Sequence, residues 1–134
     1  MRIVLDTNVL VSGFLRPYGV PGEIVRMVSS GTLELCHDSR ILGEYREVLL
    51  RPKFGFRPID VEALLEQIKF SGSPVASEPL SVTLPDPDDG AFLEAALSGK
   101  AAYLVTGNAK HFSPYKGKAV KIISPAEFLR TYKA

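Results

Sequence analysis

Short apolar runs alternate with longer segments of helical periodicity along the chain. The apolar runs are rich in β-branched or aromatic residues and do not alternate strictly with polar ones, which is typical of strands buried on both faces. They lie at residues 2–6, 33–36, 103–106 and 120–123. The helical segments lie at residues 8–15, 20–29, 39–51, 59–70, 88–98 and 125–132. Strands that alternate with helices predict βαβ units and a mostly parallel sheet.

Residues 71–87 interrupt this regular pattern. The segment is rich in serine and proline, and we expect only one further short strand in it, near residues 80–84. It is too short and too apolar to be a domain linker, and a length of 134 residues suits one domain. We therefore expect a single α/β domain over residues 1–134.

Composition and charge place few limits on function. Charged residues make up 23% of the chain and hydrophobic residues 46%, an ordinary globular balance. The net charge is only +1, whereas nucleic-acid-binding domains are often strongly basic. This value neither indicates nor excludes such a role, because the placement of the charges decides it.

The chain shows no sign of export or of a membrane span. Its start reaches the polar residues Asp6, Thr7 and Asn8 without a basic segment or a cleavage site, and no apolar run approaches about 20 residues. Cys36 is the only cysteine, so no internal disulfide can form, and we interpret it as a small buried residue. We expect a cytoplasmic protein.

Asp6 stands where the first apolar run ends. In open α/β sheets, ligands gather at the carboxyl ends of the strands, so an acid at this place is a candidate for catalysis. Aspartate is also a common N-cap, and the next helical segment begins at residue 8. From this residue alone the two interpretations stand level.

Glu44 lies at the border of an apolar helical face. The face is formed by Ile41, Leu42, Tyr45, Val48 and Leu49. Glu47 falls outside it and can pair with Arg51 four residues on, as an ordinary surface acid. Glu44 is therefore the candidate functional acid of this helix, although a surface pair with Arg40 would also explain it.

The segment Asp86–Asp89 opens the next helix. Asp86 before a proline fits an N-cap, and Asp89 then falls at the third position, as in a capping box. Yet Asp89 also projects into the middle of the apolar arc, where an unpaired carboxylate is costly. We assign Asp86 mainly to capping, Asp89 to function, and Asp88 to a second rank.

The fourth apolar run ends on Thr106, followed by Gly107 and Asn108. This is good chemistry for a tight turn, but it also brings polar groups to the strand-end edge. Acids from separate segments would repel one another there, and a divalent cation would relieve the repulsion. His37 and His111 show no ligand spacing, so carboxylates favour Mg²⁺ or Mn²⁺ over zinc.

Four segments in order, IVLDTNVLVSG, EYREVL, DPDDGAFLEAAL and YLVTGNAKHF, together resemble the PIN domain family. The likeness covers essentially the whole chain and points to the branch of toxins from type II toxin–antitoxin systems, the VapC-like ribonucleases. It implies a three-layer α/β/α sandwich with a mostly parallel sheet. It also implies hydrolysis of RNA phosphodiester bonds that depends on Mg²⁺ or Mn²⁺.

The resemblance assigns roles to particular residues. Three acids match the family's metal site, namely Asp6, Glu44 and Asp89, with Asp86 and Asp88 as further acids of this branch. Polar residues that support such a site match Thr7, Asn8 and Thr106. A fourth acid often follows the last of these strands, but this chain has Asn108, which carries no charge. We expect Asp88 and Asn108 beside one well-held cation and a weaker second one.

Basic residues are expected to hold the RNA around an acidic site. Arg51, Lys53 and Arg57 alternate with two phenylalanines, a combination that suits single-stranded RNA, and Lys110 follows Asn108. The same residues 51–58 also fit a loop whose aromatic side chains close the core.

Two other functions fit the sequence. A metal site weakened at residue 108 would leave an RNA-binding or interaction module without turnover. A structure-specific DNA nuclease is less favoured, because such enzymes usually need longer insertions. The resemblance further implies a small antitoxin partner and a homodimer, for which the helical region 59–70 is a candidate surface, although its apolar residues suit the core better.

Overall fold

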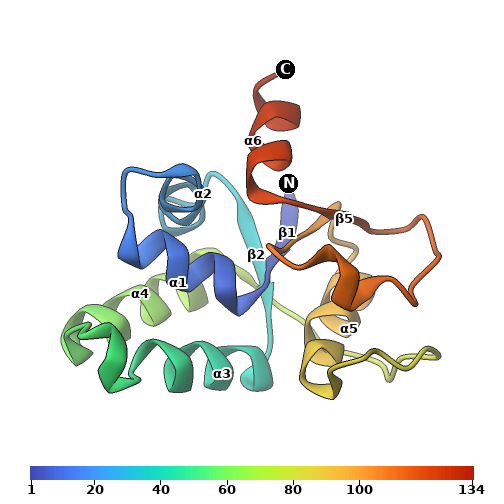
Figure 1. Cartoon of the computed structure of the whole chain (residues 1–134), viewed down its shortest axis with the longest axis horizontal. Coiled ribbons are helices and arrows are strands. Elements are labelled where there is room, and N and C mark those ends of the chain that lie inside the picture. Colours follow the sequence, from blue (N-terminus) through green and yellow to red (C-terminus); the bar gives the residue numbers. More distant parts are fainter.

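The fold is built around a five-stranded parallel sheet (Figure 1). The structure is a computed structural model that describes residues 1–134. The strand order is β3-β2-β1-β4-β5, so the first strand occupies the centre. The strands are β1 (Arg2–Leu5), β2 (Glu34–His37), β3 (Ser73–Pro74), β4 (Tyr103–Val105) and β5 (Lys121–Ile123). The mostly parallel α/β class expected from the sequence is confirmed.

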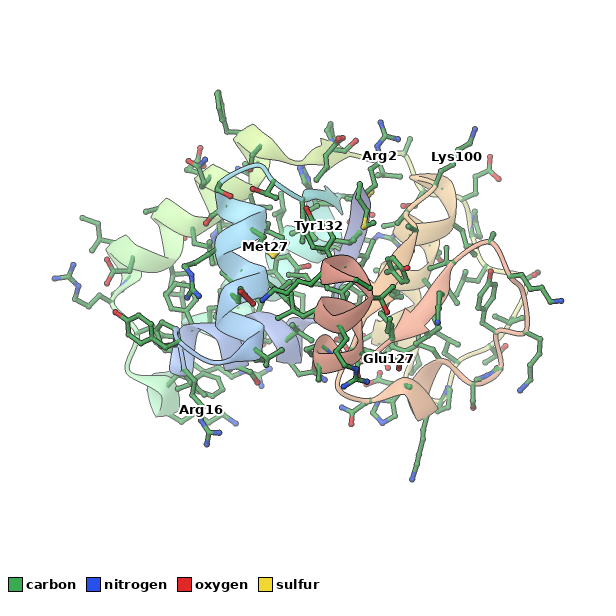
Figure 2. All side chains as sticks on the ribbon, turned by 90° about the horizontal axis from the view of Figure 1, so that it is seen from above. Arg2, Arg16, Met27, Lys100, Glu127 and Tyr132 are labelled. Carbon is green, nitrogen blue, oxygen red and sulfur yellow. The ribbon has the colours of Figure 1, made fainter.

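Six helices cover the sheet in a three-layer arrangement. They are α1 (Thr7–Leu15), α2 (Val20–Ser29), α3 (Ser39–Leu49), α4 (Pro58–Ser71), α5 (Gly90–Ser98) and α6 (Pro125–Lys133). In Figure 1, α5 lies on one side of the sheet, and α1, α2 and α4 lie on the other. Seen from above (Figure 2), α6 lies beside α2, near Met27 and Tyr132, and Lys133 Nζ is 2.9 Å from Glu23 Oε1.

The connections contain three short 3₁₀ turns. They are η1 (Pro52–Phe54), η2 (Pro87–Asp89) and η3 (Ala109–Phe112). Because η2 occupies the first turn of the segment expected to be helical from residue 88, α5 itself begins at Gly90. The other helices lie within two residues of their expected bounds.

The strand expected near residues 80–84 is wrong. This stretch forms no backbone ladder, and its apolar side chains instead anchor an irregular segment, with Leu84 buried in the core. The fifth strand is β3, whose two residues pair with Cys36 and His37 at one edge of the sheet. Proline lacks an amide donor and is tolerated at sheet edges, so Pro74 fits β3 but hides it from a search for strand formers.

One continuous hydrophobic core joins the layers. It includes the fully buried Cys36, as expected, and it takes up Val61, Leu65 and Ile68 of α4. The dimer surface suggested by region 59–70 is therefore mostly core, and Ile59 and Phe70 are the large apolar residues that α4 exposes. None of the helices combines the length and the apolar character needed to cross a membrane.

Candidate active site

An open pocket of about 410 Å³ lies where the central strands end. Strands β1 and β4 are parallel neighbours, so Asp6 after β1 and Thr106 after β4 reach the same edge of the sheet. The pocket is lined by most of the residues singled out in the sequence, namely Asp6, Thr7, Asn8, Glu44, Asp86, Asp88, Asp89 and Asn108. The structure thus brings these side chains together around one pocket, and their roles stay predictions.

Asp6 precedes α1 in extended conformation but makes no side-chain cap. Its Oδ2 instead accepts a hydrogen bond of 2.7 Å from Thr106 Oγ1 and a longer one of 3.4 Å from Asn8 Nδ2. Asp6 therefore holds the N-cap position of α1, but its side chain does not make the capping hydrogen bond that this interpretation expects. Burial raises the pKa of Asp6, and the Thr106 hydrogen bond opposes that rise only in part.

Glu44 reaches the pocket from α3, where it is half-buried. It accepts a hydrogen bond from the hydroxyl of Thr7, the residue that follows Asp6. Burial raises the pKa of Glu44, the Thr7 hydrogen bond lowers it, and the charges of Asp6 and Asp88 add to the rise.

Helix α3 is also tied to β1 from below. The buried Tyr45, next to Glu44, donates a hydrogen bond of 2.6 Å from its hydroxyl to the carbonyl oxygen of Leu5, next to Asp6. The backbones that carry two of the acids are thus joined directly.

Asp86 and Asp89 divide the two tasks expected of them. Asp86 is exposed and caps η2, because its Oδ1 accepts a 3.0 Å hydrogen bond from the Asp88 amide. Asp89 makes no capping box; it is buried, and its Oδ2 has no hydrogen-bond partner. Burial, together with the charges of Asp6 and Asp86, raises the pKa of Asp89 to about 6.

Residues 106–108 close the pocket from the β4 side. Thr106 is buried behind the pocket, and its Oγ1 accepts a 3.0 Å hydrogen bond from the Asn108 amide while it donates to Asp6. Gly107 N donates to Asn8 Oδ1 at 3.4 Å. Asn108 is exposed at the rim, where it offers an amide side chain and no charge.

His111 is the pocket residue that sequence reasoning missed. It belongs to η3, lines the pocket, and places Nδ1 3.4 Å from Asp89 Oδ2, in a geometry that is not a hydrogen bond. No local ligand spacing marks it, because its partner lies 22 residues earlier in the chain. Its only signal is its position one short turn after Asn108 at a strand end.

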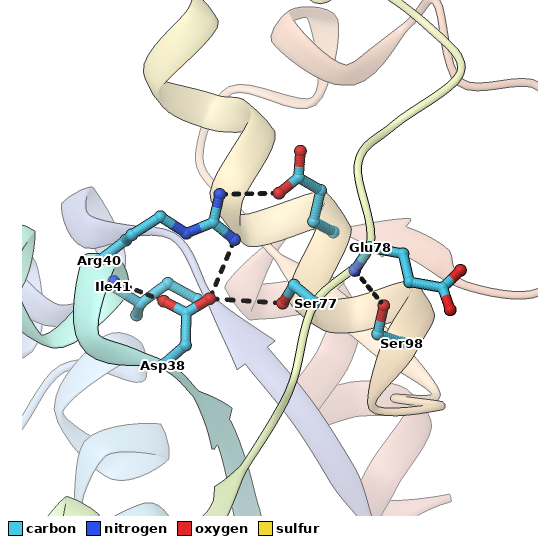
Figure 3. A network of polar contacts seen from close by, with 7 residues as sticks. Asp38, Arg40, Ile41, Ser77, Glu78 and Ser98 are labelled. Carbon is cyan, nitrogen blue, oxygen red and sulfur yellow. Dashed lines mark hydrogen bonds and ion pairs between the residues drawn. The ribbon is translucent and has the colours of Figure 1, made fainter.

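Outside the pocket, a second group of acids surrounds Arg40 between α3 and α5 (Figure 3). Arg40 Nη1 is 2.7 Å from Glu94 Oε1 on α5, and Arg40 Nη2 is 2.9 Å from Asp38 Oδ2. Asp38 also caps α3 through a 3.0 Å hydrogen bond from the Ile41 amide and accepts one of 3.3 Å from Ser77 Oγ. The alternative in which Arg40 pairs with Glu44 is therefore wrong.

The pKa of Asp38 moves in the opposite direction from those of the pocket acids. Burial alone raises it, but the Ile41 amide and the Arg40 guanidinium outweigh burial and leave it below its usual value. A carboxylate between α3 and α5 therefore stays in its charged form readily where an arginine lies beside it.

None of the four basic residues expected to hold RNA lines the pocket. Arg57 forms a two-pronged ion pair with Asp60, at 2.9 and 3.2 Å, and Arg51 lies 3.4 Å from Glu47, as predicted for that pair. Lys53 Nζ lies 5.1 Å from the ring centroid of Phe54, which does line the pocket. Lys110 is exposed and makes no ion pair.

The donor atoms of the pocket fit a hard divalent cation in their chemistry. They are carboxylate and amide oxygens, they include a buried Asp89 oxygen with no partner, and three of the acids have a raised pKa that a cation would relieve. The side chains surround a space rather than one point, because no three Asp, Glu, His or Cys groups stand close enough to share an ion.

The structure is a parallel α/β sheet with an acid-lined pocket at its strand ends. The PIN domain family model matches residues 2–110, and the chain belongs to this family. PIN domains are typically nucleases and generally use divalent metal ions. No curated protein matches the chain. The matched range includes every predicted acid and Asn108, and it ends one residue before His111.

Proposed function

We propose that the chain is a metal-dependent endoribonuclease that hydrolyses RNA phosphodiester bonds. The observation that carries the proposal is the buried, partnerless Oδ2 of Asp89 in a pocket shared with Asp6 and Glu44. Burial and neighbouring acids raise the pKa values of all three carboxyl groups, so their charged forms are disfavoured and a bound cation would stabilise them. Membership of a family of nucleases supports the same conclusion.

The proposed ligands are Asp6, Glu44 and Asp89, with Asp88 and Asn108 at their side. Oxygen donors of this kind suit Mg²⁺ or Mn²⁺. When bound, the cation supplies a water of lowered pKa and neutralises charge on the attacked phosphate.

The polar neighbours of the acids have a positioning role in this proposal. Thr106 and Asn8 donate to Asp6, and Thr7 donates to Glu44. Ionised carboxylates only accept hydrogen bonds, so these three donors favour the charged form that binds a cation. Thr7 and Asn8 belong to the first turn of α1, and Thr106 directly follows β4, so these donors keep the acids oriented before substrate arrives.

Binding of RNA needs positive charge at the rim, because the pocket itself is acidic. Lys110 is exposed and unpaired beside Asn108, and Lys53 stands next to Phe54 on the pocket wall. Such basic and aromatic groups suit a single strand. Arg57 and Arg51 are already paired with acids of the chain, so their share in RNA binding is expected to be smaller.

The biological role we propose is that of the toxin in a toxin–antitoxin pair, with a small antitoxin covering the pocket and a homodimer as the assembly. Support for it comes from the likeness of the four sequence segments to VapC-like ribonucleases. A short gene for a small protein directly beside this one would support the pairing, and a solitary gene would count against it.

The catalytic proposal is tested on single-stranded RNA with the chain and its Asp6→Asn variant. We expect cleavage with Mn²⁺ or Mg²⁺, none with EDTA, and none by a variant whose circular dichroism matches the original. Undiminished metal-dependent cleavage by Asp6→Asn would overturn the assignment of Asp6.

A second candidate is an RNA-binding module without turnover. The uncharged Asn108 and the wide spacing of the acids favour it. Binding of labelled RNA that persists in EDTA, with no cleavage under any divalent ion, would select this module. Cleavage of a branched DNA substrate in preference to RNA would instead select a structure-specific DNA nuclease.

A further inference from the structure

His111 shares the pocket with the acids and is not explained by any role given above. It lies on η3, is about half exposed, and faces Asp89 across 3.4 Å between Nδ1 and Oδ2. A surface histidine normally turns its ring nitrogens to water. Here one nitrogen is directed at a carboxylate oxygen that is itself withdrawn from solvent.

The contact between these two atoms does not have the geometry of a hydrogen bond. Asp89 Oδ2 and His111 Nδ1 lie 3.4 Å apart, and Asp89 Oδ2 has no hydrogen-bond partner. The two atoms are therefore close enough to bind one cation together, although the same separation also fits an ion pair.

The surroundings of Asn108 give an independent reason. The strand end at residue 108 brings an amide to the rim, so the acid set has three buried or half-buried carboxylates and no fourth one from this side. His111 stands three residues later on the same short turn and does reach the pocket. It can supply a nitrogen donor from the β4 side, beside the uncharged amide of Asn108.

We propose that His111 binds the catalytic cation directly through Nδ1, beside Asp89. Imidazole nitrogen is a common ligand of first-row transition-metal ions, so Mn²⁺ serves as the probe of this contact. This inference rests on the proposed metal-dependent function. It adds to that function the identity of a nitrogen ligand.

Pulsed electron paramagnetic resonance of bound Mn²⁺ tests the proposal, because a directly bound imidazole adds a nitrogen modulation to the signal. The sample is the whole chain with one equivalent of Mn²⁺, prepared with ordinary and with ¹⁵N-labelled histidine. We expect a nitrogen modulation that changes with the isotope and disappears in His111→Gln. Since the chain contains only two histidines, His37→Gln is the matched control and should keep the modulation.

Calorimetric titration provides the second measurement. His111→Gln should lower Mn²⁺ affinity about tenfold, because the cation loses a direct ligand. The variant is expected to fold, because His111 is half exposed, and circular dichroism checks this. His37 is buried, so should its variant fail to fold, the His111 variant and the isotope exchange still decide.

The outcomes separate this inference from the proposed function. Mn²⁺ bound without any nitrogen modulation, or with a modulation that survives in His111→Gln, overturns the histidine ligand and leaves the nuclease proposal standing. No binding of Mn²⁺ or Mg²⁺ at millimolar concentrations overturns both. A modulation lost in His111→Gln, with weaker but measurable Mn²⁺ binding, supports both.

Discussion

Helices α3 and α5 face each other through two groups of acids that behave in opposite ways. On one side, Asp38 and Glu94 share Arg40, and the three side chains join the helices (Figure 3). On the pocket side, one helical turn along α3, Glu44 lies near Asp89 without an arginine. The pKa of Asp38 is lowered, whereas burial and neighbouring acids raise the pKa values of Glu44 and Asp89.

The difference shows how the chain separates structure from chemistry. An acid paired with an arginine of its own chain is already neutralised, and the ion pair helps to hold the two helices together. An acid of similar burial without such a partner makes the folded state less stable when it is ionised, and we expect a bound cation to offset that cost. The presence or absence of Arg40 at each site therefore distinguishes the two groups better than burial does.

Exchanging one acid in each group should produce the largest contrast. Asp89→Asn should reduce nuclease activity about a thousandfold, because it removes a proposed metal ligand, while the free energy of unfolding stays equal or rises. Asp38→Asn should keep most activity and lose about 1 to 2 kcal/mol of stability, because it weakens a cap and an ion pair. RNA cleavage rates and urea unfolding measure both, and equal effects of the two variants would remove the contrast.

The pH dependence of stability should differ next. A carboxyl whose pKa is raised on folding holds its proton longer in the folded state, so metal-free stability falls as pH rises through that range. For Asp89, a rise from 3.8 to about 6 corresponds to at most about 3 kcal/mol. The cost appears above about pH 4 and is complete above about pH 6.

Asp89→Asn supplies the control for that measurement. The difference in unfolding free energy between this variant and the original chain should widen between about pH 4 and pH 6.5 in EDTA, in favour of the variant. A constant difference over that range would show that Asp89 does not titrate as its surroundings require.

Metal binding should stabilise the pocket side alone. At a free Mn²⁺ concentration of 100 times the dissociation constant, the folded chain should gain about 2.7 kcal/mol. Thermal unfolding with Mn²⁺ or EDTA measures this gain. The stabilisation should vanish in Asp89→Asn and persist in Glu94→Gln, because Glu94 is already paired with Arg40. Loss of the stabilisation in both variants would contradict the separation of the two groups.

Removing Arg40 should have a smaller effect. Arg40→Gln is expected to lower stability by about 1 kcal/mol, since the arginine is half exposed and solvent screens its ion pairs. A double-mutant cycle with Glu94→Gln isolates the link between α3 and α5. A coupling energy indistinguishable from zero would mean that the Arg40–Glu94 ion pair contributes nothing to holding the two helices together.

The smallest expected effects concern basic side chains, which also differ in whether a partner of opposite charge lies beside them. Arg57 is paired with Asp60, so Arg57→Gln should change RNA affinity by less than about twofold. Lys110 is unpaired, and Lys110→Gln should weaken binding more and reduce its dependence on salt. Filter binding at two salt concentrations distinguishes the two, and a larger loss in the arginine variant would reverse the assignment.

Much of this arrangement could be predicted from the sequence because burial leaves a periodic record. The central strands were found from their apolar runs, and Glu44 and Asp89 from their positions on apolar helical faces. β3 escaped because its two residues include Pro74, and the strand expected at 80–84 came from apolar residues that anchor an irregular segment.

Long-range partners were the part that the sequence hid. Arg40 was considered as a partner for Glu44 four residues away. It instead pairs with Asp38 at the helix cap and with Glu94, 54 residues on. His111 was not selected because it shows no local ligand spacing. The fold nevertheless places it beside Asp89, which lies 22 residues earlier in the chain. Local periodicity reports which face is buried, and it carries no record of which distant charge shares that face.

The place of β1 at the centre of the sheet has a consequence for the order in which the chain is made. Asp6 is synthesised before Thr106, whose hydroxyl orients it from 100 residues later in the chain. Pairing over such a distance forms late. A growing chain therefore carries its first acids in an unassembled state, and the pocket is completed only when β4 takes its place beside β1.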